Sequence, residues 1–165
     1  PDEAGVGQLC LRGPGMFDAY LDPWKLRREV LDEDGWFHTG DLGRFDEDGF
    51  LYFEGRKKEL IRRAGEMISP VTIELEALKY ESVADCAAVG VPDPIMEEEI
   101  KLVVVARDEL APADLAAFLA QSLPKHMLPR YVEFMAQIPK TPTQKVQRFK
   151  LAQISNATHD LKAKA

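Results

Sequence analysis

Cysteine and long hydrophobic runs are both scarce in this sequence, and their scarcity limits the classes of protein to which it can belong. Cys10 and Cys86 are the two cysteines and lie far apart, so we expect neither a disulfide framework nor a cysteine-based zinc site. No apolar run approaches the roughly 20 residues that a membrane-spanning helix needs. The first five residues lack the basic and then apolar character of a signal peptide. We therefore expect a cytoplasmic protein without a transmembrane segment.

A surplus of basic residues is also absent. The 21 Lys and Arg stand against 28 Asp and Glu, which gives a formal net charge of −7 and argues against nucleic acid as the main partner. Residues 56–63 depart from this balance with five basic residues and one acid. Such a segment can bind a small anion such as phosphate or form a solvated basic face, and charge alone leaves both interpretations open.

Residues 1–55 are predicted to consist mostly of strands and turns. Residues 7–12 alternate polar and apolar side chains, and residues 42–45 and 50–53 flank an Asp-Glu-Asp-Gly turn that is typical of a β-hairpin. These strands are too few for an independent sheet, so we expect partner strands from outside the chain. The chain also begins with Pro1 rather than Met, which indicates a piece of a longer polypeptide.

The character of the sequence changes after Gly55. The later pattern predicts a helix, two strands, a helix and one more strand; their ranges are 70–78, 84–91, 100–106, 111–123 and 131–135. This order predicts a small two-layer α+β domain with helices on one face of a three-stranded sheet. The last fifteen residues are expected to form a short helix.

Three segments carry polar residues that a structural role alone explains poorly. Residues 35–41 (Gly-Trp-Phe-His-Thr-Gly-Asp) place Asp41 after a glycine between strands, where its carboxylate could accept hydrogen bonds from vicinal hydroxyls or serve as an ordinary turn residue. Residues 55–70 form an unusually basic linker. Residues 138–148 present Lys145 from a proline-punctuated loop, although a loop lysine is usually only solvated.

In this order and spacing the three segments resemble the adenylate-forming superfamily. That superfamily includes acyl- and aryl-coenzyme A (CoA) synthetases, firefly-luciferase-like enzymes and the adenylation domains of peptide synthetases. The resemblance runs from the strand at Gly7 and the Tyr-Leu-Asp-Pro of residues 20–23, through Thr-Gly-Asp and Gly-Arg-x-Lys, to the Pro-Lys-Thr-Pro-Thr-x-Lys loop. It is closest to the acyl-CoA synthetases.

The resemblance implies a division of the chain and a role for several residues. Residues 1–55 would be the end of the large amino-terminal adenylation domain, and residues 56–165 would be the small mobile carboxy-terminal domain. Asp41 and Arg56 would bind the ribose hydroxyls of ATP. Lys58 would be the hinge about which the small domain turns between two half-reactions.

The remaining implied site residues lie in the small domain. Lys145 would be the catalytic lysine, which brings positive charge to the substrate carboxylate and the α-phosphate. Arg62, Gly65 and Glu66 would belong to the loop that enters for thioester formation with CoA. Two positions depart from the commonest pattern of the superfamily, since Gln144 stands where Gly is usual and Arg62 stands where Lys is frequent.

The implied parent enzyme converts a fatty or aryl carboxylic acid, ATP and CoA into acyl-CoA, AMP and pyrophosphate, with Mg²⁺ bound to the nucleotide. The phosphate-binding loop of the superfamily has no counterpart here, so the chain should be inactive without its missing amino-terminal domain. Three alternatives stay open: a peptide-synthetase adenylation domain, a luciferase-like oxygenase and a non-catalytic α+β binding module. His38 and His126 have no partners at ligand spacing, so we expect structural or surface roles and no metal site.

Overall fold

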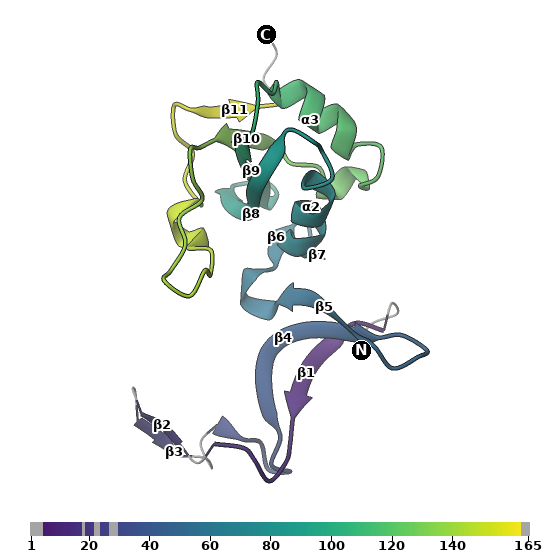
Figure 1. The fold of residues 1–165 in the computed structure, drawn as a ribbon, viewed down its shortest axis with the longest axis vertical. Helices are drawn as coiled ribbons and strands as arrows, with labels where there is room; N and C mark the ends of the chain where they lie inside the picture. Colours follow the sequence, from purple (N-terminus) through teal and green to yellow (C-terminus); the bar gives the residue numbers. More distant parts are fainter. Residues whose placement is uncertain (1–4, 18, 22–23, 27–29, 163–165) are drawn as a thin grey trace. The chain divides into compact units, whose positions relative to one another are not determined.

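The chain divides into two compact units, Pro1–Lys58 and Glu59–Ala165, and each contains its own sheet (Figure 1). The computed structural model describes residues 5–17, 19–21, 24–26 and 30–162. Asp22 and Pro23, which contribute to the resemblance, lie outside these described residues. The assignment of the two units to the domains of a larger enzyme stays a prediction.

The first unit is built from antiparallel strands. Strands β1 (Gly7–Leu11), β4 (Phe37–Phe45) and β5 (Leu51–Arg56) form one sheet in the order β1-β4-β5, and β2 (Ala19–Leu21) pairs with β3 (Trp24–Leu26). The predicted hairpin is confirmed: β4 pairs with β5, and one carboxylate oxygen of Asp46 accepts the backbone N–H groups of Asp48 and Phe50. The Asx turn therefore sets the register at this end of the hairpin.

This small sheet leaves large apolar side chains in solvent. Five residues around the β4–β5 turn are 45–67% exposed: Phe45, Phe50, Leu51, Tyr52 and Phe53. A sheet of three strands normally covers such side chains with a second layer, which the described part of the first unit does not supply.

The second unit has the predicted α+β class, but its sheet is larger than expected. Strands β6 (Ile61–Arg63), β7 (Glu66–Ile68), β9 (Glu97–Ala106), β10 (Tyr131–Phe134) and β11 (Thr158–Asp160) follow the order β11-β10-β9-β6-β7, and β8 (Val83–Asp93) pairs with β9. The prediction of three strands found β8, β9 and β10. It missed the β6–β7 hairpin because charged residues hide its alternation: Arg63 points inward and Arg62 outward.

The prediction of a helix in the last fifteen residues is wrong. Residues 158–160 instead form β11, which pairs antiparallel with β10. The side chain of Glu133 explains this, because it accepts hydrogen bonds from the hydroxyls of Ser155 and Thr158. These contacts hold an extended segment at the sheet edge.

The two faces of the large sheet have different coverings (Figure 1). Helices α2 (Pro70–Ala77) and α3 (Pro112–Leu119) pack on one face, where Ile73 and Leu115 meet Leu102 of β9. On the other face, Val103 packs against Ile138 and Leu151. Successive residues of β9 point to opposite faces, so one strand holds both layers. The second layer is the segment that carries Lys145.

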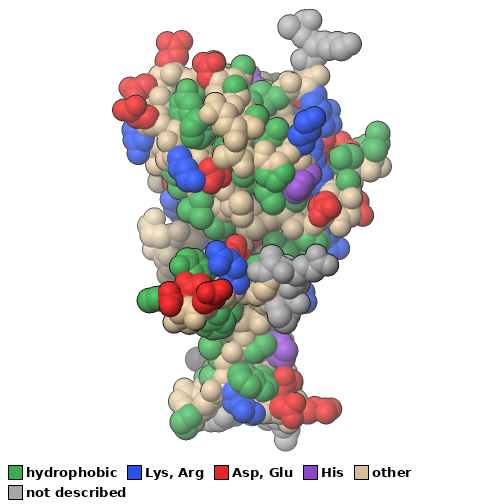
Figure 2. All heavy atoms as spheres, turned by 90° about the vertical axis from the view of Figure 1, so that its right-hand side faces the viewer, with side chains coloured by type: hydrophobic (Ala, Val, Ile, Leu, Met, Phe, Trp, Pro, Cys, Tyr) green, Lys and Arg blue, Asp and Glu red, His purple; other side chains and the backbone are tan. Residues whose placement is uncertain are grey.

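Basic and acidic side chains lie interspersed on the face of the second unit that Figure 2 shows. This arrangement agrees with a chain that has many charges of both signs. No helix among the described residues is long and apolar enough to span a membrane.

Gly90 of β8 leaves room for the side chain of Glu98 of the paired strand β9. A Cβ atom at residue 90 would lie 2.6 Å from Cδ of Glu98, well inside contact distance. The same Glu98 carboxylate accepts the backbone N–H of Arg62 at 2.7 Å. The missing side chain at Gly90 thus allows Glu98 to reach back and hold strand β6.

We predict that Gly90→Ala displaces Glu98 and releases the amide of Arg62. Loss of this hydrogen bond should lower the free energy of unfolding of the second unit by about 1 kcal/mol. Amide hydrogen exchange should show faster exchange at Arg62 with little change at Leu102. The control is Gly15→Ala, since a Cβ there meets nothing within 4 Å. Unchanged exchange at Arg62 in Gly90→Ala would show that Glu98 does not need this space.

Candidate functional site

Asp41 and Arg56 meet across the β4–β5 pair of the first unit. They are register partners, and Nε of Arg56 donates to Oδ1 of Asp41 at 2.7 Å. Gly40 has a φ of +79°, and the hydroxyl of Thr39 accepts the backbone N–H of Asp41 while donating to the carbonyl of Leu9. The carboxylate is therefore fixed by its own strand and by β1. Its side chain stays 28% exposed and can still accept hydrogen bonds from a ligand.

Lys58 lies at the end of the first unit. It belongs to a single turn of 3₁₀ helix, η1 (Lys57–Glu59), and the division between the two units falls between Lys58 and Glu59. The Lys58 side chain is exposed, so a change in its backbone angles would not disturb a core.

Arg62, Gly65 and Glu66 lie together on the β6–β7 hairpin of the second unit. Ala64 and Gly65 form its two-residue turn with φ values of +51° and +84°. Both residues are left-handed, which gives the type of turn that matches the twist of two antiparallel strands. The amide of Ala64 donates to the carbonyl of Met96 at 3.0 Å. The three predicted residues are exposed, so the hairpin presents a cation and an anion beside a glycine.

Lys145 lies on a narrow loop that is closed by its own backbone. Lys140 and Val146 form a β-bridge, and the amide of Thr141 donates to the carbonyl of Lys145 at 2.8 Å. The Nζ atom of Lys140 lies 2.5 Å from the carboxylate of Asp85, whereas Nζ of Lys145 makes no ion pair among the described residues. The loop thus has one lysine that anchors it and one that it presents to solvent.

His38 of the first unit contacts two other side chains. His38 lies between Asp32, whose carboxylate is 2.8 Å from Nε2, and Cys10, whose sulfur is 3.5 Å from Nδ1. Backbone N–H groups, first that of Trp36, and His38 itself hold the pKa of Asp32 below its ordinary value. The described residues contain no group of three or more His, Cys, Asp or Glu that could hold a metal ion.

Comparison with known proteins assigns the second unit to a family. Residues 72–145 match the model of the AMP-binding enzyme C-terminal domain. By this match the second unit contains the C-terminal domain of the AMP-binding enzymes. The chain is 42% identical over 149 residues to a sulfoacetate–CoA ligase of Cupriavidus necator, covering 88% of this chain and 29% of that protein. It is 39% identical to an oxalate–CoA ligase of Arabidopsis thaliana over 89% of this chain and 29% of that ligase.

A solved structure has a similar fold. ATP-bound MatB from Rhodopseudomonas palustris superimposes with a TM-score of 0.81 at 30% identity, over 89% of this chain and 30% of that protein. The chain therefore spans about 30% of the length of the relatives that it matches.

Gln144 in the Lys145 loop has a backbone conformation that favours glycine. Its φ is +64°, in the left-handed region that costs a residue with a Cβ about 1–2 kcal/mol. The amide of Gln144 donates to the carbonyl of Thr141 at 2.9 Å, which closes the turn just before Lys145. The AMP-binding C-terminal domain thus keeps the loop conformation even with an unfavourable residue.

An ion cluster that the sequence did not reveal anchors this loop. Nε of Arg148 donates to Glu59 at 2.9 Å, and Nη1 donates to Glu74 at 2.5 Å and to the carbonyl of Ala88 at 2.7 Å. Burial lowers the pKa of Arg148, but the carboxylates of Glu74 and Glu59 outweigh burial and leave the pKa above its ordinary value. Residues 59, 74 and 148 meet only through the fold, so sequence spacing carried no signal for them.

We predict that Gln144→Gly stabilises the second unit by up to about 1 kcal/mol, because glycine adopts the left-handed conformation without strain but gains entropy when unfolded. Protection of the β9 amides in hydrogen exchange measures this change. Gln147→Gly is the matched control, because Gln147 has a φ of −87° and should only lose stability. Equal destabilisation by both substitutions would contradict strain at Gln144.

We predict that Arg148→Gln lowers the free energy of unfolding of the second unit by about 3 kcal/mol, because it leaves Glu74 and Glu59 facing each other in a partly buried site. Arg44→Gln provides the comparison. Its salt bridge with Glu54 is more exposed and should contribute about 1 kcal/mol or less to the first unit. Hydrogen exchange resolves the two units separately. If Arg148→Gln lowered the free energy of unfolding no more than Arg44→Gln, the ion cluster would not stabilise the second unit as predicted.

Proposed function

We propose that this chain is the carboxy-terminal part of an AMP-forming acyl-CoA synthetase. The parent enzyme joins a carboxylic acid to AMP with release of pyrophosphate, then transfers the acyl group to the thiol of CoA. The observation that carries this proposal is the exposed Lys145, which makes no ion pair with any described residue, on an anchored loop of an AMP-binding C-terminal domain. The names of the relatives, which include sulfoacetate– and oxalate–CoA ligases, support CoA as acceptor.

In the first half-reaction Asp41 and Arg56 bind the ribose of ATP. A carboxylate beside a guanidinium offers acceptors and donors together, which suits a pair of vicinal hydroxyls. Thr39 and Gly40 fix the direction of Asp41, so little ordering remains for the ligand to impose. Mg²⁺ would accompany ATP and supply charge neutralisation at its phosphates.

Lys145 serves adenylation as a point charge. Negative charge develops between the attacking carboxylate and the α-phosphate, and an ammonium directed there stabilises the transition state more than the ground state. Lys140 cannot take this role, since Asp85 already holds it at 2.5 Å. The chemistry of the loop therefore depends on Lys145.

The hinge and the hairpin serve the second half-reaction. Rotation at Lys58 would remove Lys145 and bring Arg62, Gly65 and Glu66 to the acyl-adenylate. Gly65, which has no side chain, leaves room for the pantetheine arm of CoA, and the guanidinium of Arg62 can bind phosphate.

The rest of the parent is needed for turnover. The first unit, taken as the end of the large amino-terminal domain, exposes Phe45, Phe50 and Phe53, which the missing part of that domain would cover. The 165 residues alone should therefore not turn over. A cytoplasmic location agrees with the two unpaired cysteines.

A screen of acids and acceptors tests the specificity of the proposed parent enzyme. Sulfoacetate, oxalate and 2-succinylbenzoate, named in the relatives, each have a second acidic group, so a screen should include such acids beside fatty and aryl acids. An amide bond synthetase, McbA from Marinactinospora thermotolerans, is also similar at 34% identity and a TM-score of 0.79. Amines should therefore be tested beside CoA. The peptide-synthetase, luciferase-like and non-catalytic alternatives predict different products or none.

We predict that Lys145→Ala in the intact parent lowers acid-dependent pyrophosphate release by about 100-fold, because it removes a charge that acts in the transition state. Thioester formation from supplied acyl-adenylate should stay within about twofold of the unchanged enzyme, because Lys145 is not used there. Lys150→Ala removes an exposed lysine from the neighbouring 3₁₀ turn and should leave both rates unchanged. Undiminished pyrophosphate release in Lys145→Ala would refute the catalytic assignment.

A further inference from the structure

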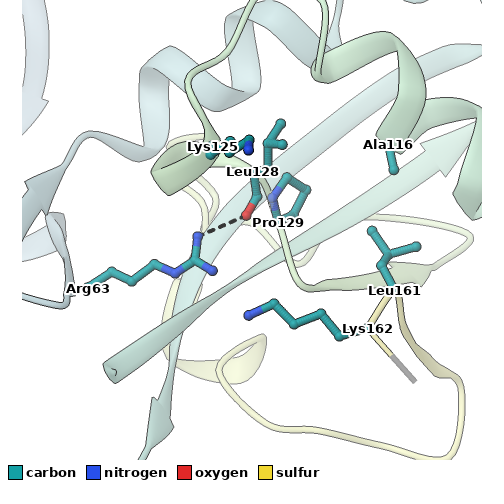
Figure 3. A pocket seen from close by; sticks show the side chains of 7 residues that line it. All are labelled: Arg63, Ala116, Lys125, Leu128, Pro129, Leu161 and Lys162. Carbon is teal, nitrogen blue, oxygen red and sulfur yellow. Dashed lines mark hydrogen bonds between the residues drawn. The ribbon is translucent and has the colours of Figure 1, made fainter. Parts of the chain in front are cut away.

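The second unit contains a pocket that none of the predicted site residues lines. Its volume is about 380 Å³, and it lies between strand β6, helix α3, the turn η2 (Lys125–Met127) and the end of the described chain. In Figure 3 the guanidinium of Arg63 and the ammonium of Lys162 approach from one side, while Leu128, Pro129 and Leu161 form apolar walls. The volume is at the lower end of the range for small-molecule sites.

The charged residues that line this pocket are all basic. Arg63, Lys125 and Lys162 contribute to its walls and no acidic residue does, in a chain whose net charge is −7. Two of the three cations are shared with the buried carboxylate of Glu99, which lies 2.7 Å from Nη2 of Arg63 and 2.7 Å from Nζ of Lys162. Lys125 makes no ion pair among the described residues. The pocket therefore keeps an excess of positive charge.

The donors in this pocket are only partly used. Arg63 is 6% exposed, and its Nη1 donates to the carbonyls of His126 and Leu128, but Nε has no hydrogen-bond partner within the described chain. Lys162 has one contact with Glu99, which leaves two of its three N–H groups for other acceptors. Glu99 itself is 1% exposed and holds both cations in place. The ion pairs of the buried Glu99 with Arg63 and Lys162 thus hold two of the side chains that line the pocket.

From this combination we infer that the pocket binds a small amphipathic carboxylate. Lys125 and Lys162 would donate to the carboxylate, and Leu128, Pro129 and Leu161 would cover an apolar body of about ten heavy atoms. A polyanion such as a nucleotide fits less well, because the walls offer apolar surface where its sugar and further phosphates would need donors.

Because strand β6 lines the pocket, a ligand bound there would affect the β6–β7 hairpin. Arg63 faces the pocket on β6, and the adjacent Arg62 faces the opposite side, as successive residues of a strand do. A bound carboxylate would therefore restrain the hairpin that carries Arg62, Gly65 and Glu66. The pocket is distinct from the Lys145 site, and its ligand takes no part in the proposed reaction. It would instead be an effector site for acids.

The test uses the 165-residue chain, sodium octanoate as the probe and octan-1-ol as its uncharged counterpart. Backbone amide chemical shifts are followed during titration. Octanoate should give saturable shifts at Arg63, Ala116 and Leu161, and octan-1-ol should bind at least fivefold more weakly. Two variants should reduce octanoate binding: Lys125→Gln by about fivefold, the equivalent of one exposed ion pair, and Ala116→Trp completely, by filling the pocket.

The control is Lys79→Gln, which removes an exposed lysine that does not line the pocket and should leave the affinity unchanged. Lys125→Gln changes only an exposed side chain, so it tests the site even where Ala116→Trp disturbs folding. Equal affinity for octan-1-ol would reduce the site to an apolar cavity and overturn the inference. Octanoate shifts that map only to the first unit, or that persist in both variants, would also overturn it.

Discussion

The second unit depends on two cations, the buried Lys101 and the partly buried Arg148, that hold the carboxy-terminal segment on the sheet. Lys101 of β9 is 2% exposed, and its Nζ donates to the carbonyls of Leu151 and Gln153 and lies 2.9 Å from Glu133. Arg148, which lies in the same segment as Leu151 and Gln153, contacts Glu59, Glu74 and the carbonyl of Ala88. A charge this deeply placed is stable only when its partners are complete, so neither cation can move without a large cost. The segment is thereby held on a face that no helix covers.

These contacts explain how the loop that carries Lys145 can be both narrow and exposed. Residues 138–148 contain two prolines and no α-helix, and they bury only Ile138 within that range. The anchors lie at its two ends, at the Lys140–Asp85 contact and at Arg148, so the middle of the loop needs no core of its own. Lys145 can then face solvent while its backbone stays in one conformation. The left-handed Gln144 is tolerated for the same reason, because the anchors fix the backbone around it.

The sequence predicted the parts of the molecule that depend on local pattern. The α+β class, helix α2 at its proline and strands β8, β9 and β10 followed from periodicity and turn residues. The predictions failed where charge and topology decide the outcome. β6 contains two arginines, and the buried Arg63 is neutralised by Glu99 of β9, a strand that is far away in the sequence but adjacent in the sheet. β11 has three residues and depends on Glu133 for its extended form. Similarly, Asp41 was expected as a ligand residue from its motif, but its contact with Arg56 follows from the β4–β5 register.

The two units place different demands on a larger enzyme. The second unit has a complete core with residues such as Ile73, Leu102 and Leu119 at 0% exposure, so it resembles an independently folding domain. The first unit has a sheet of three strands and exposed aromatic residues, so it requires further protein to cover it. The division after Lys58 therefore separates a unit with a complete core from a unit whose apolar side chains stay exposed. A unit with its own core can change its orientation as a whole without losing that core, and this is the physical condition that the proposed role of Lys145 requires.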